Sequence, residues 1–299
     1  AEYVEPGEEH EIVSGLTSLV AFPKLPKLTR LSGNRQTTLQ SMIPAVVQVL
    51  QQALEANDEP AAKSIFEFFD TISLSVRKIL RFLEMRGQGL KRLHPQECPI
   101  ITPHITSLIE FLLRSAGNLA YDNDLRIMCL NALLFLVRFK KSKIQQLNLA
   151  GSIITALLPI GAEPEPTDIE DDAPSRTAFR VIDSLATSLP PTQVFPPLFE
   201  QVRALSASPD PNLRKSAIMA FGVVVEGCSL FIQPHLDSMW PLIQNGLQDP
   251  EVIVRKAACT ALGCLCEVLE EECAKQHAML LPLISKLMGD AETQRQACV

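Results

Sequence analysis

The feature that most constrains this sequence is an internal repeat with an offset of 41 residues. Residues 208–226 superpose on residues 249–267 at this single offset, with identities spread over the whole segment. A unit of this length is one supersecondary element that buries its apolar side by stacking on its neighbours, so we expect a repeat protein. The identical pairs are Pro209/Pro250, Arg214/Arg255, Lys215/Lys256, Ala217/Ala258, Ala220/Ala261, Gly222/Gly263 and Glu226/Glu267.

Apolar residues within each unit recur with the spacing of an α-helix. The spacing predicts a first helix opened by Asp-Pro or Ser-Pro, a turn, and a second helix with a proline in its first half. Further first helices are expected at 59–75, 122–139 and 174–189, which together make an all-α solenoid. The two clearest stripes are Val254, Ala258, Ala261, Leu265 and Leu236, Trp240, Ile243, Leu247.

Composition excludes two broad classes of protein. Of the 299 residues, 46% are hydrophobic and 20% are charged, whereas disordered chains combine low hydrophobicity with high charge. The formal net charge is −7 at pH 7, and phosphate binding needs clustered Lys and Arg. We therefore expect a folded chain that does not bind nucleic acid directly and that attracts basic partners.

The eight cysteines follow no metal-binding pattern. None forms a C-x-x-C pair, and no Cys/His cluster has the spacing of a zinc site. Cys259, Cys264 and Cys266 lie in an Ala/Leu-rich helical run. We interpret these three as small buried hydrophobic residues in a reducing compartment.

The sequence carries no recognisable catalytic motif. It has no G-x-G-x-x-G, Walker A, G-x-S-x-G or H-E-x-x-H, and its five histidines are scattered. Asp70 and Asp183 fall late in equivalent first helices, where capping or hydrogen bonding between repeats is expected. No secretory leader and no run of about 18 apolar residues is present. We expect no catalytic residues, no cofactor, no metal ion and no membrane contact.

Two stretches lack repeat character, residues 13–40 and 76–96. Each begins with Val and ends with Gln, so retained introns and genuine surface loops both stay open as explanations. Both ends of the chain fall inside repeat units, which predicts a piece of a longer array. The expected organisation is a partial repeat with an irregular insert at 1–40, repeat helices at 41–75, an irregular insert at 76–97, repeats at 98–290 with an acidic loop at 161–173, and the start of another repeat at 291–299.

The repeat unit resembles a HEAT repeat. Residues 249–263 fit the first-helix pattern D-P-x-x-x-V-R-x-x-A-x-x-A-L-G. The order of distinctive pieces extends the resemblance over about 40–75 and 98–290. It is similar to the middle of importin-β superfamily nuclear transport receptors (karyopherin-β), most closely the importin-4 class. The pieces are L-R-I-M-C-L-N-A-L-L-F-L-V at 125–137, E-P-E-P-T-D-I-E-D-D at 163–172, F-R-V-I-D-S-L-A-T-S-L-P-P at 179–191 and P-L-F-E-Q-V at 197–202.

This resemblance implies a HEAT-repeat α-solenoid, an armadillo-like superhelix, that carries protein through the nuclear pore. The implied partners are basic cargo with nuclear localisation signals, such as histones and ribosomal proteins, together with Ran-GTP and FG-repeat proteins of the pore. Ran-GTP would control cargo release, and the receptor would shuttle between cytoplasm and nucleus. The alternative is a HEAT scaffold subunit of a phosphatase or of a chromosome-organising complex, which would show more uniform repeats and no acidic loop.

In arrays that this chain resembles, the second helices line a concave groove. Counted from the aligned prolines, the positions off the apolar stripe are polar, with three acids and no Lys or Arg. One sign of charge attracts an oppositely charged ligand, and amides hydrogen-bond an extended backbone. An ordinary solvated helix face is the alternative. The candidate cargo-binding residues are Glu110, Glu200, Gln201, Asp237, Gln244 and Asn245, with Thr106, Ser107 and Gln193 beside them.

The connection at 163–172 places six carboxylates in ten residues. Its two prolines disfavour a helix, so an exposed, self-repelling loop is expected. By resemblance to importin-β relatives it is a candidate for binding Ran or basic cargo, and the alternative is a solubilising loop. Its acids are Glu163, Glu165, Asp168, Glu170, Asp171 and Asp172.

The repeat alignment also predicts how neighbouring helices pack. Ala258 and Ala261 are expected in a tight seam between paired helices. Arg214 and Arg255 are expected to form a ladder along the stacked first helices and not a cargo site.

Overall fold

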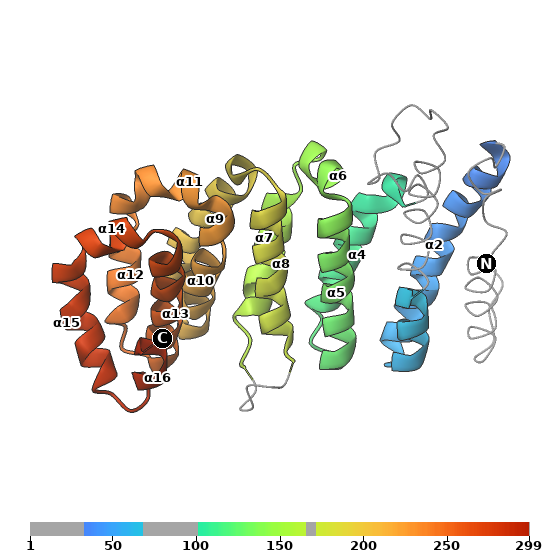
Figure 1. Cartoon of the computed structure of the whole chain (residues 1–299). Helices are drawn as coiled ribbons and strands as arrows, with labels where there is room; N and C mark the ends of the chain where they lie inside the picture. The colour runs from blue at the N-terminus through green and yellow to red at the C-terminus, as the bar shows by residue number, and fades with distance from the viewer. Residues whose placement is uncertain (1–32, 68–100, 166–171, 299) are drawn as a thin grey trace, which may run out of the picture. The chain divides into compact units, whose positions relative to one another are not determined.

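The structure, a computed structural model, describes residues 33–67, 101–165 and 172–298, and every regular element in these ranges is a helix. The chain divides into two compact units, residues 1–132 and 133–299. Helix α5 (Asn123–Phe139) begins in the first unit and ends in the second. The all-α fold predicted from the repeat spacing is confirmed (Figure 1).

In the first unit, α2 (Gly33–Glu55) is a continuous helix with Pro44 inside it, and residues 59–67 form a further helical segment. The helix begins at Gly33, so residues 33–40, which were expected to be irregular, are helical. A 3₁₀ turn, η2 (Thr102–His104), leads into α4 (Ile105–Ala116). The rest of the stretch 13–40, the end of the predicted helix 59–75 and the whole of 76–96 lie outside the described residues.

In the second unit the longer helices stand roughly parallel to one another, α10 packs against both α9 and α13, and α11 runs across the top of the view (Figure 1). First helices are α8, α10 and α13, and second helices are α7, α9, α12 and α15. The bounds are α6 Lys141–Gln146, α7 Ala150–Gly161, α8 Pro174–Ser188, α9 Pro191–Ser206, α10 Pro211–Val223, α11 Val225–Ile232, η3 Gln233–Ser238, α12 Trp240–Leu247, α13 Val252–Val268, α14 Glu270–Lys275, α15 His277–Met288 and α16 Gln294–Ala297.

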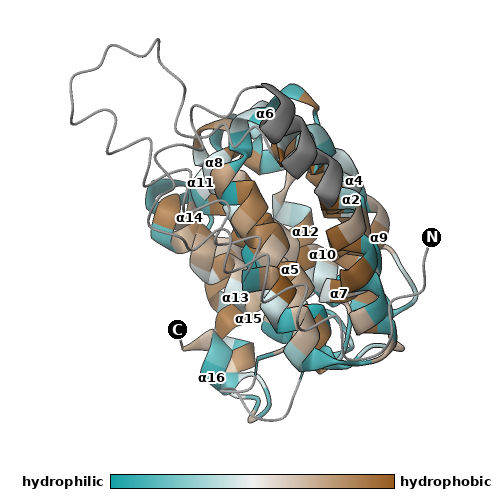
Figure 2. Cartoon of the chain, turned by 90° about the vertical axis from the view of Figure 1, so that its right-hand side faces the viewer, coloured by the Kyte–Doolittle hydropathy of each residue, from teal (hydrophilic) through white to brown (hydrophobic). Residues whose placement is uncertain are grey.

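The predicted apolar stripes form the core. All four residues of the first-helix stripe on α13, including Val254 and Leu265, are fully buried. The second-helix stripe from Leu236 to Leu247 is buried as well, and Trp240 is a core residue with 6% of its surface exposed. Hydrophobic residues gather on the helix sides that face one another, while α6 and α16 are more hydrophilic (Figure 2).

In one repeat the second helix is not a single rod, contrary to the simple two-helix expectation, whereas α9 and α15 are each continuous. The unit after α10 is broken into α11, η3 and α12, with Pro234 and Pro241 opening the second and third pieces. Proline has no N–H to donate and is favoured in the first turn of a helix, where Pro234 and Pro241 lie, whereas α9 and α15 continue through their internal prolines. Among the described residues no single helix is long and apolar enough to cross a membrane. Helix α10 and the segment α11–η3 together have the length and the apolar composition of a membrane span, but a bend of 77° separates them.

The seam between repeats depends on a glycine. A Cβ added to Gly222 on α10 would lie 2.8 Å from the Ala261 Cα on α13, so the two first helices touch almost backbone to backbone. The other predicted seam residue, Ala258, faces Gly246 of α12. Both alanines therefore pack against the preceding repeat, and the expectation of a seam within one helix pair is corrected to a seam between stacked repeats.

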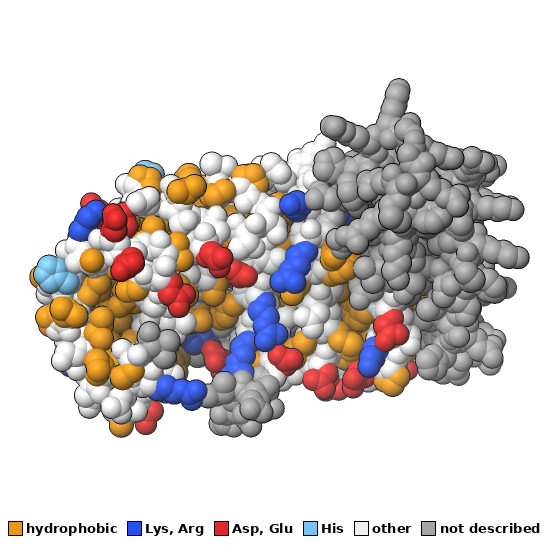
Figure 3. Space-filling model, viewed as in Figure 1, with side chains coloured by type: hydrophobic (Ala, Val, Ile, Leu, Met, Phe, Trp, Pro, Cys, Tyr) orange, Lys and Arg blue, Asp and Glu red, His pale blue; other side chains and the backbone are white. Residues whose placement is uncertain are grey.

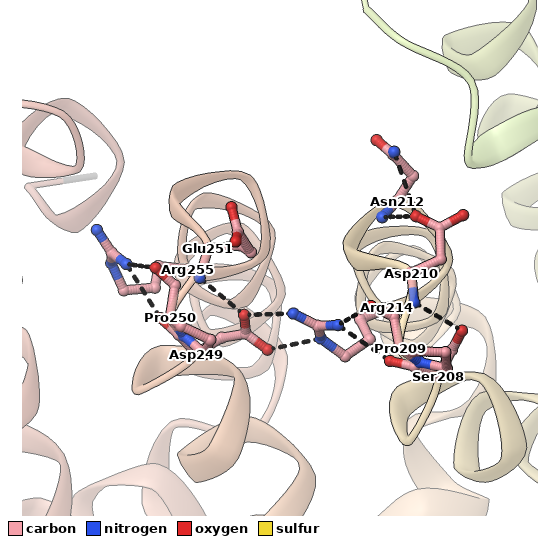
Figure 4. Close-up of polar contacts among 9 residues, drawn as sticks. All are labelled: Ser208, Pro209, Asp210, Asn212, Arg214, Asp249, Pro250, Glu251 and Arg255. Atoms are coloured by element: carbon pink, nitrogen blue, oxygen red, sulfur yellow. Dashed lines mark hydrogen bonds and ion pairs between the residues drawn. The ribbon is translucent and has the colours of Figure 1, made fainter.

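The predicted arginine ladder is present (Figure 4). Arg214 donates through Nε and Nη2 to the two carboxylate oxygens of Asp249, both at 2.8 Å, and through Nη1 to the carbonyls of Ser208 and Pro209. Asp249 also accepts from the Glu251 amide at 2.9 Å, which closes the turn before α13. Arg214 thus closes the turn of its own repeat and binds the carboxylate in the corresponding turn of the next repeat.

The same contacts recur one repeat later with weaker geometry. Arg255 donates to the Asp249 and Pro250 carbonyls and to one oxygen of Asp290 at 3.1 Å. In the preceding repeat the offset of 41 residues places Ser208, which has no carboxylate, at the position of Asp249. The Ser208 hydroxyl keeps only the contact within the turn, accepting from the Asp210 amide at 3.2 Å.

The two repeat-equivalent glycines give a matched test of the seam. Gly222→Ala should lower the free energy of unfolding by about 1–3 kcal/mol, because the new methyl group overlaps the α13 backbone. Gly263→Ala should raise it by up to about 1 kcal/mol, since nothing lies within 4 Å and alanine favours the helix. Urea unfolding of both variants measures this, and effects of the same sign would contradict the seam.

The ladder gives a second test. Arg214→Gln should cost about 1–3 kcal/mol of unfolding free energy, because it leaves the largely buried Asp249 carboxylate without its two charged hydrogen bonds. Arg255→Gln is the control and should cost less, since its partner Asp290 is 38% exposed. Thermal and urea unfolding measure both, and equal losses would argue against a role for the buried pair.

The same pair sets a pH dependence. Burial raises the pKa of Asp249, but hydrogen bonds from Arg214 and the Glu251 amide outweigh burial and hold that pKa below its ordinary value. Because the pKa of Asp249 is lower in the folded protein than in the unfolded chain, the Arg214–Asp249 pair contributes its full stabilisation above about pH 4. This stabilisation is lost as the pH falls through the pKa that Asp249 has in the folded protein. The stability gap between the wild type and Arg214→Gln should therefore narrow in acid.

Candidate functional site

The six candidate cargo-binding residues, which we call the second-helix row, lie on second helices as predicted. Glu110 is exposed on α4 in the first unit, and the other five belong to the second unit. Glu200 and Asp237 are exposed on α9 and η3, while Gln201 is half-buried. Gln244 is half-buried and Asn245 is exposed on α12. That this row binds a ligand stays a prediction.

The local folding of α9 explains why its acid points outward. Val194, Leu198 and Val202 are fully buried at four-residue spacing, so Glu200 between them falls on the opposite face. Gln193 in the first turn of the same helix has a buried Oε1 atom with no hydrogen-bond partner. A buried amide oxygen without a donor is rare.

Two cations near the row were missed by the sequence reasoning. Arg114 is exposed four residues after Glu110, and Arg203 is exposed three residues after Glu200. Both occupy the last turn of their helix, where a positive charge complements the helix dipole. The helical spacing i+3 or i+4 would have revealed them. The exposed face is therefore acidic in its middle and basic at its C-terminal end.

The acidic loop is anchored to the array at both of its described ends. Glu165 lies 3.8 Å from both the Arg176 Nε and the Lys215 Nζ, and Asp172 lies 3.3 Å from the Arg180 Nη1. The Lys215 ammonium also donates to the Glu163 carbonyl at 3.0 Å. Asp168, Glu170 and Asp171 lie outside the described residues. Two of the described carboxylates, Glu165 and Asp172, are therefore paired with cations.

The cations that hold the loop come from two first helices. Figure 3 shows Lys and Arg side chains gathered beside the grey loop, over α8. Lys215 is 6% exposed, and burial lowers its pKa while Glu165 and Glu163 oppose that shift. A cavity of about 410 Å³ lies between the loop end and helices α10 and α13. Its apolar side is formed by Met219, Ile253 and Ala257, and Lys256 stands at its edge.

Asp183 lies late in α8 as expected, and its capping or hydrogen bonding between repeats stays a prediction. It is half-buried on α8, and burial together with Glu226 of α11 raises its pKa, while Arg138 opposes the shift. The two helices meet closely because a Cβ on Gly227 would lie 2.4 Å from the Ala186 carbonyl carbon. Asp70 lies outside the described residues. Among the described residues no group of three or more His, Cys, Asp or Glu side chains could hold a metal ion.

The cysteine interpretation is only partly right. Cys259 is buried as expected, but Cys264 is half-buried and Cys266 is exposed. The Ala/Leu-rich composition around the three cysteines does not indicate which of them is exposed. Cys266 is exposed because it lies near the end of α13, where the helix leaves the core.

Comparison with known proteins supports the repeat assignment and extends it. A family model described as a HEAT-like repeat matches residues 211–265, from α10 into α13. The chain is 34% identical over 250 residues to the Schizosaccharomyces pombe protein named "Probable importin subunit beta-4", covering 84% of this chain and 22% of that relative. It is 31% identical over 236 residues to Importin-4 of Mus musculus, covering 71% of this chain and 22% of the relative.

Solved structures share the fold. Kap121p bound to RanGTP superposes with a TM-score of 0.73 at 17% identity, over 97% of this chain and 28% of that chain. Kap121p bound to Pho4p gives a TM-score of 0.74 at 18% identity, over 98% and 28% of the two chains. Kap121p bound to Nup53p gives 0.75 at 18% identity, over 97% and 28%. At these identities the likeness shows the fold alone.

The repeat pattern, the order of the distinctive segments and the similarity to importin-4 proteins agree with one another. The chain spans 22% of the length of the curated relatives it matches. It belongs to the importin-β family and is an importin-4-like segment of HEAT repeats.

Proposed function

We propose that this chain is the cargo-binding middle of a nuclear import receptor. It binds the basic nuclear localisation signals of cargo such as histones and ribosomal proteins, and Ran-GTP controls their release. The whole receptor shuttles between cytoplasm and nucleus and contacts FG-repeat proteins in the pore. The observation that carries this proposal is the second-helix row, acidic in its middle and exposed, in a chain of the importin-β family.

The chemistry of the row suits an extended basic peptide. Glu200 and Asp237 attract Lys and Arg side chains, and Gln244 and Asn245 bring amides that pair with a peptide backbone. Arg203 at the end of α9 would repel a cation placed there, which fixes the direction and the length of the signal that fits.

The known behaviour of a structural neighbour supports the choice of partners. Kap121p has been crystallised with RanGTP, with Pho4p and with the nucleoporin Nup53p. The acidic loop would act at longer range through Asp168, Glu170 and Asp171, because Glu165 and Asp172 already form ion pairs within the array. An exposed loop of this kind changes association rates, and salt screens its effect over about 8 Å.

Separate rate measurements distinguish the loop from the row. In a triple variant, Asp168, Glu170 and Asp171 become Ser, which keeps the ion pairs of Glu165 and Asp172. It should bind a histone-tail peptide with a slower association rate and a flatter salt dependence. The double variant Glu200→Gln with Asp237→Asn should dissociate about two- to fivefold faster per lost contact, the effect of roughly 0.5–1 kcal/mol.

The control is Glu270→Gln with Glu271→Gln on α14, which changes the net charge as much as the row variant does. Stopped-flow fluorescence at two salt concentrations gives both rate constants. If the control accelerates dissociation as much as the row variant, net charge and not the row governs binding. Unchanged association in the loop variant would leave the loop as a solubilising connection.

A further inference from the structure

The cavity of about 410 Å³ between α10, α13 and the end of the acidic loop, which we call the first-helix cavity, is separate from the second-helix row. Its lining residues come from the loop end, from these two first helices and from α16, which contributes Gln296. None of them lies on a second helix. A ligand in this cavity would therefore not touch the residues proposed for cargo binding.

Two lysines at equivalent positions of consecutive repeats line the cavity. Lys215 lies on α10 and is 6% exposed, whereas the side chain of Lys256 on α13 is 36% exposed. Glu165 is the one acid among the lining residues, so the lining carries one more positive charge than negative. The chain as a whole has a formal net charge of −7. The cavity is therefore a local cationic site on an acidic protein, which favours an anionic ligand.

The buried ammonium of Lys215 has more hydrogen-bond donors than acceptors around it. It carries three N–H groups and donates one of them to the Glu163 carbonyl at 3.0 Å. The Glu165 Oε1 atom lies 3.8 Å from the Lys215 Nζ, which is too far for a hydrogen bond. Two donors of a nearly buried charge thus lack an acceptor among the described residues. A carboxylate entering the cavity would supply one.

The remaining lining suits a peptide with an aliphatic side chain. Ile253 is a large hydrophobic residue that is 38% exposed at the cavity, next to the half-buried Met219 and the buried Ala257. An aliphatic group placed against them would remove this apolar surface from water. Asn212 and Gln296 add side-chain amides, which pair with the backbone of an extended peptide.

We propose that the first-helix cavity binds an extended acidic segment of a partner protein, in which one Leu or Ile lies two residues from an acid on either side. Residues two apart in an extended chain point to the same side, so both kinds of side chain enter the cavity together. The acids pair with Lys215 and Lys256, and the aliphatic side chain covers Ile253. This inference goes beyond the proposed function and does not depend on it.

The test titrates the whole chain into a rhodamine-labelled peptide, Gly-Ser-Glu-Gly-Leu-Gly-Glu-Ser-Gly, and follows fluorescence anisotropy. Three control peptides carry Gln for both Glu, Ala for Leu, or Phe-Gly pairs without acids. Each control should bind at least fivefold more weakly. Equal binding of the Gln peptide or of the Ala peptide would show that only one half of the recognition exists and would overturn the proposal. Equal binding of the Phe-Gly peptide would assign the cavity to pore repeats instead.

Two variants of the chain should change the affinity in opposite directions. Lys256→Gln should weaken binding of the acidic peptide about two- to fivefold, because one partly exposed ion pair is lost. Glu165→Gln should strengthen it by a similar factor, since the carboxylate that repels the ligand from Lys215 is removed while the side-chain size is kept. A contact that served only the fold would not produce this gain.

Matched controls change the net charge equally at exposed positions outside the cavity. Lys286→Gln on α15 and Glu270→Gln on α14 should leave the affinity unchanged, and urea unfolding checks that every variant is folded. The row variant Glu200→Gln with Asp237→Asn should also bind the acidic peptide as the wild type does. Loss of binding in the row variant, equal effects in the controls, or a wild-type Kd weaker than about 1 mM would overturn the proposal.

Discussion

The close approach of α10 and α13 is the constraint on which the rest of the second unit depends. The absence of a side chain at Gly222 lets the Ala261 backbone come within the space that a Cβ would need. At that spacing the apolar stripe that contains Ala258 and Leu265 is buried from water. The same spacing lets the Nε and Nη2 of Arg214 donate to the two carboxylate oxygens of Asp249. A wider spacing would open the core and break the bidentate pair together.

The first and second helices differ in whether their polar side chains are used for contacts within the array. The first helices carry the ladder and the cations that hold the acidic loop, and these side chains are committed to contacts within the array. The outward positions of α9, η3 and α12 carry acids and amides that the core does not use. In the proposed binding mode, removal of these side chains would change the affinity for a basic peptide more than the stability of the fold.

Sequence periodicity was sufficient for the helices, the buried stripes and the ladder, because each depends on local spacing or on one repeat offset. It was insufficient for contacts between distant residues. The Lys215 contact with the Glu163 carbonyl spans 52 residues, and nothing in the loop sequence indicates it. The exposure of Cys266 and the breaks at η3 and α14 depend on where a helix leaves the core, which composition does not record. The position of Arg203 beside Glu200, by contrast, could have been predicted, because residues three apart in a helix lie on the same face.

Hydrogen exchange in the presence of a saturating histone-tail peptide tests the central claim most directly, because it reports which helices the ligand covers. The account predicts slower exchange of the amides of α9 and η3–α12, with α10 and α13 unchanged. Protection confined to α10 and α13, or no protection by the basic peptide at all, would contradict the assignment of cargo binding to the second helices.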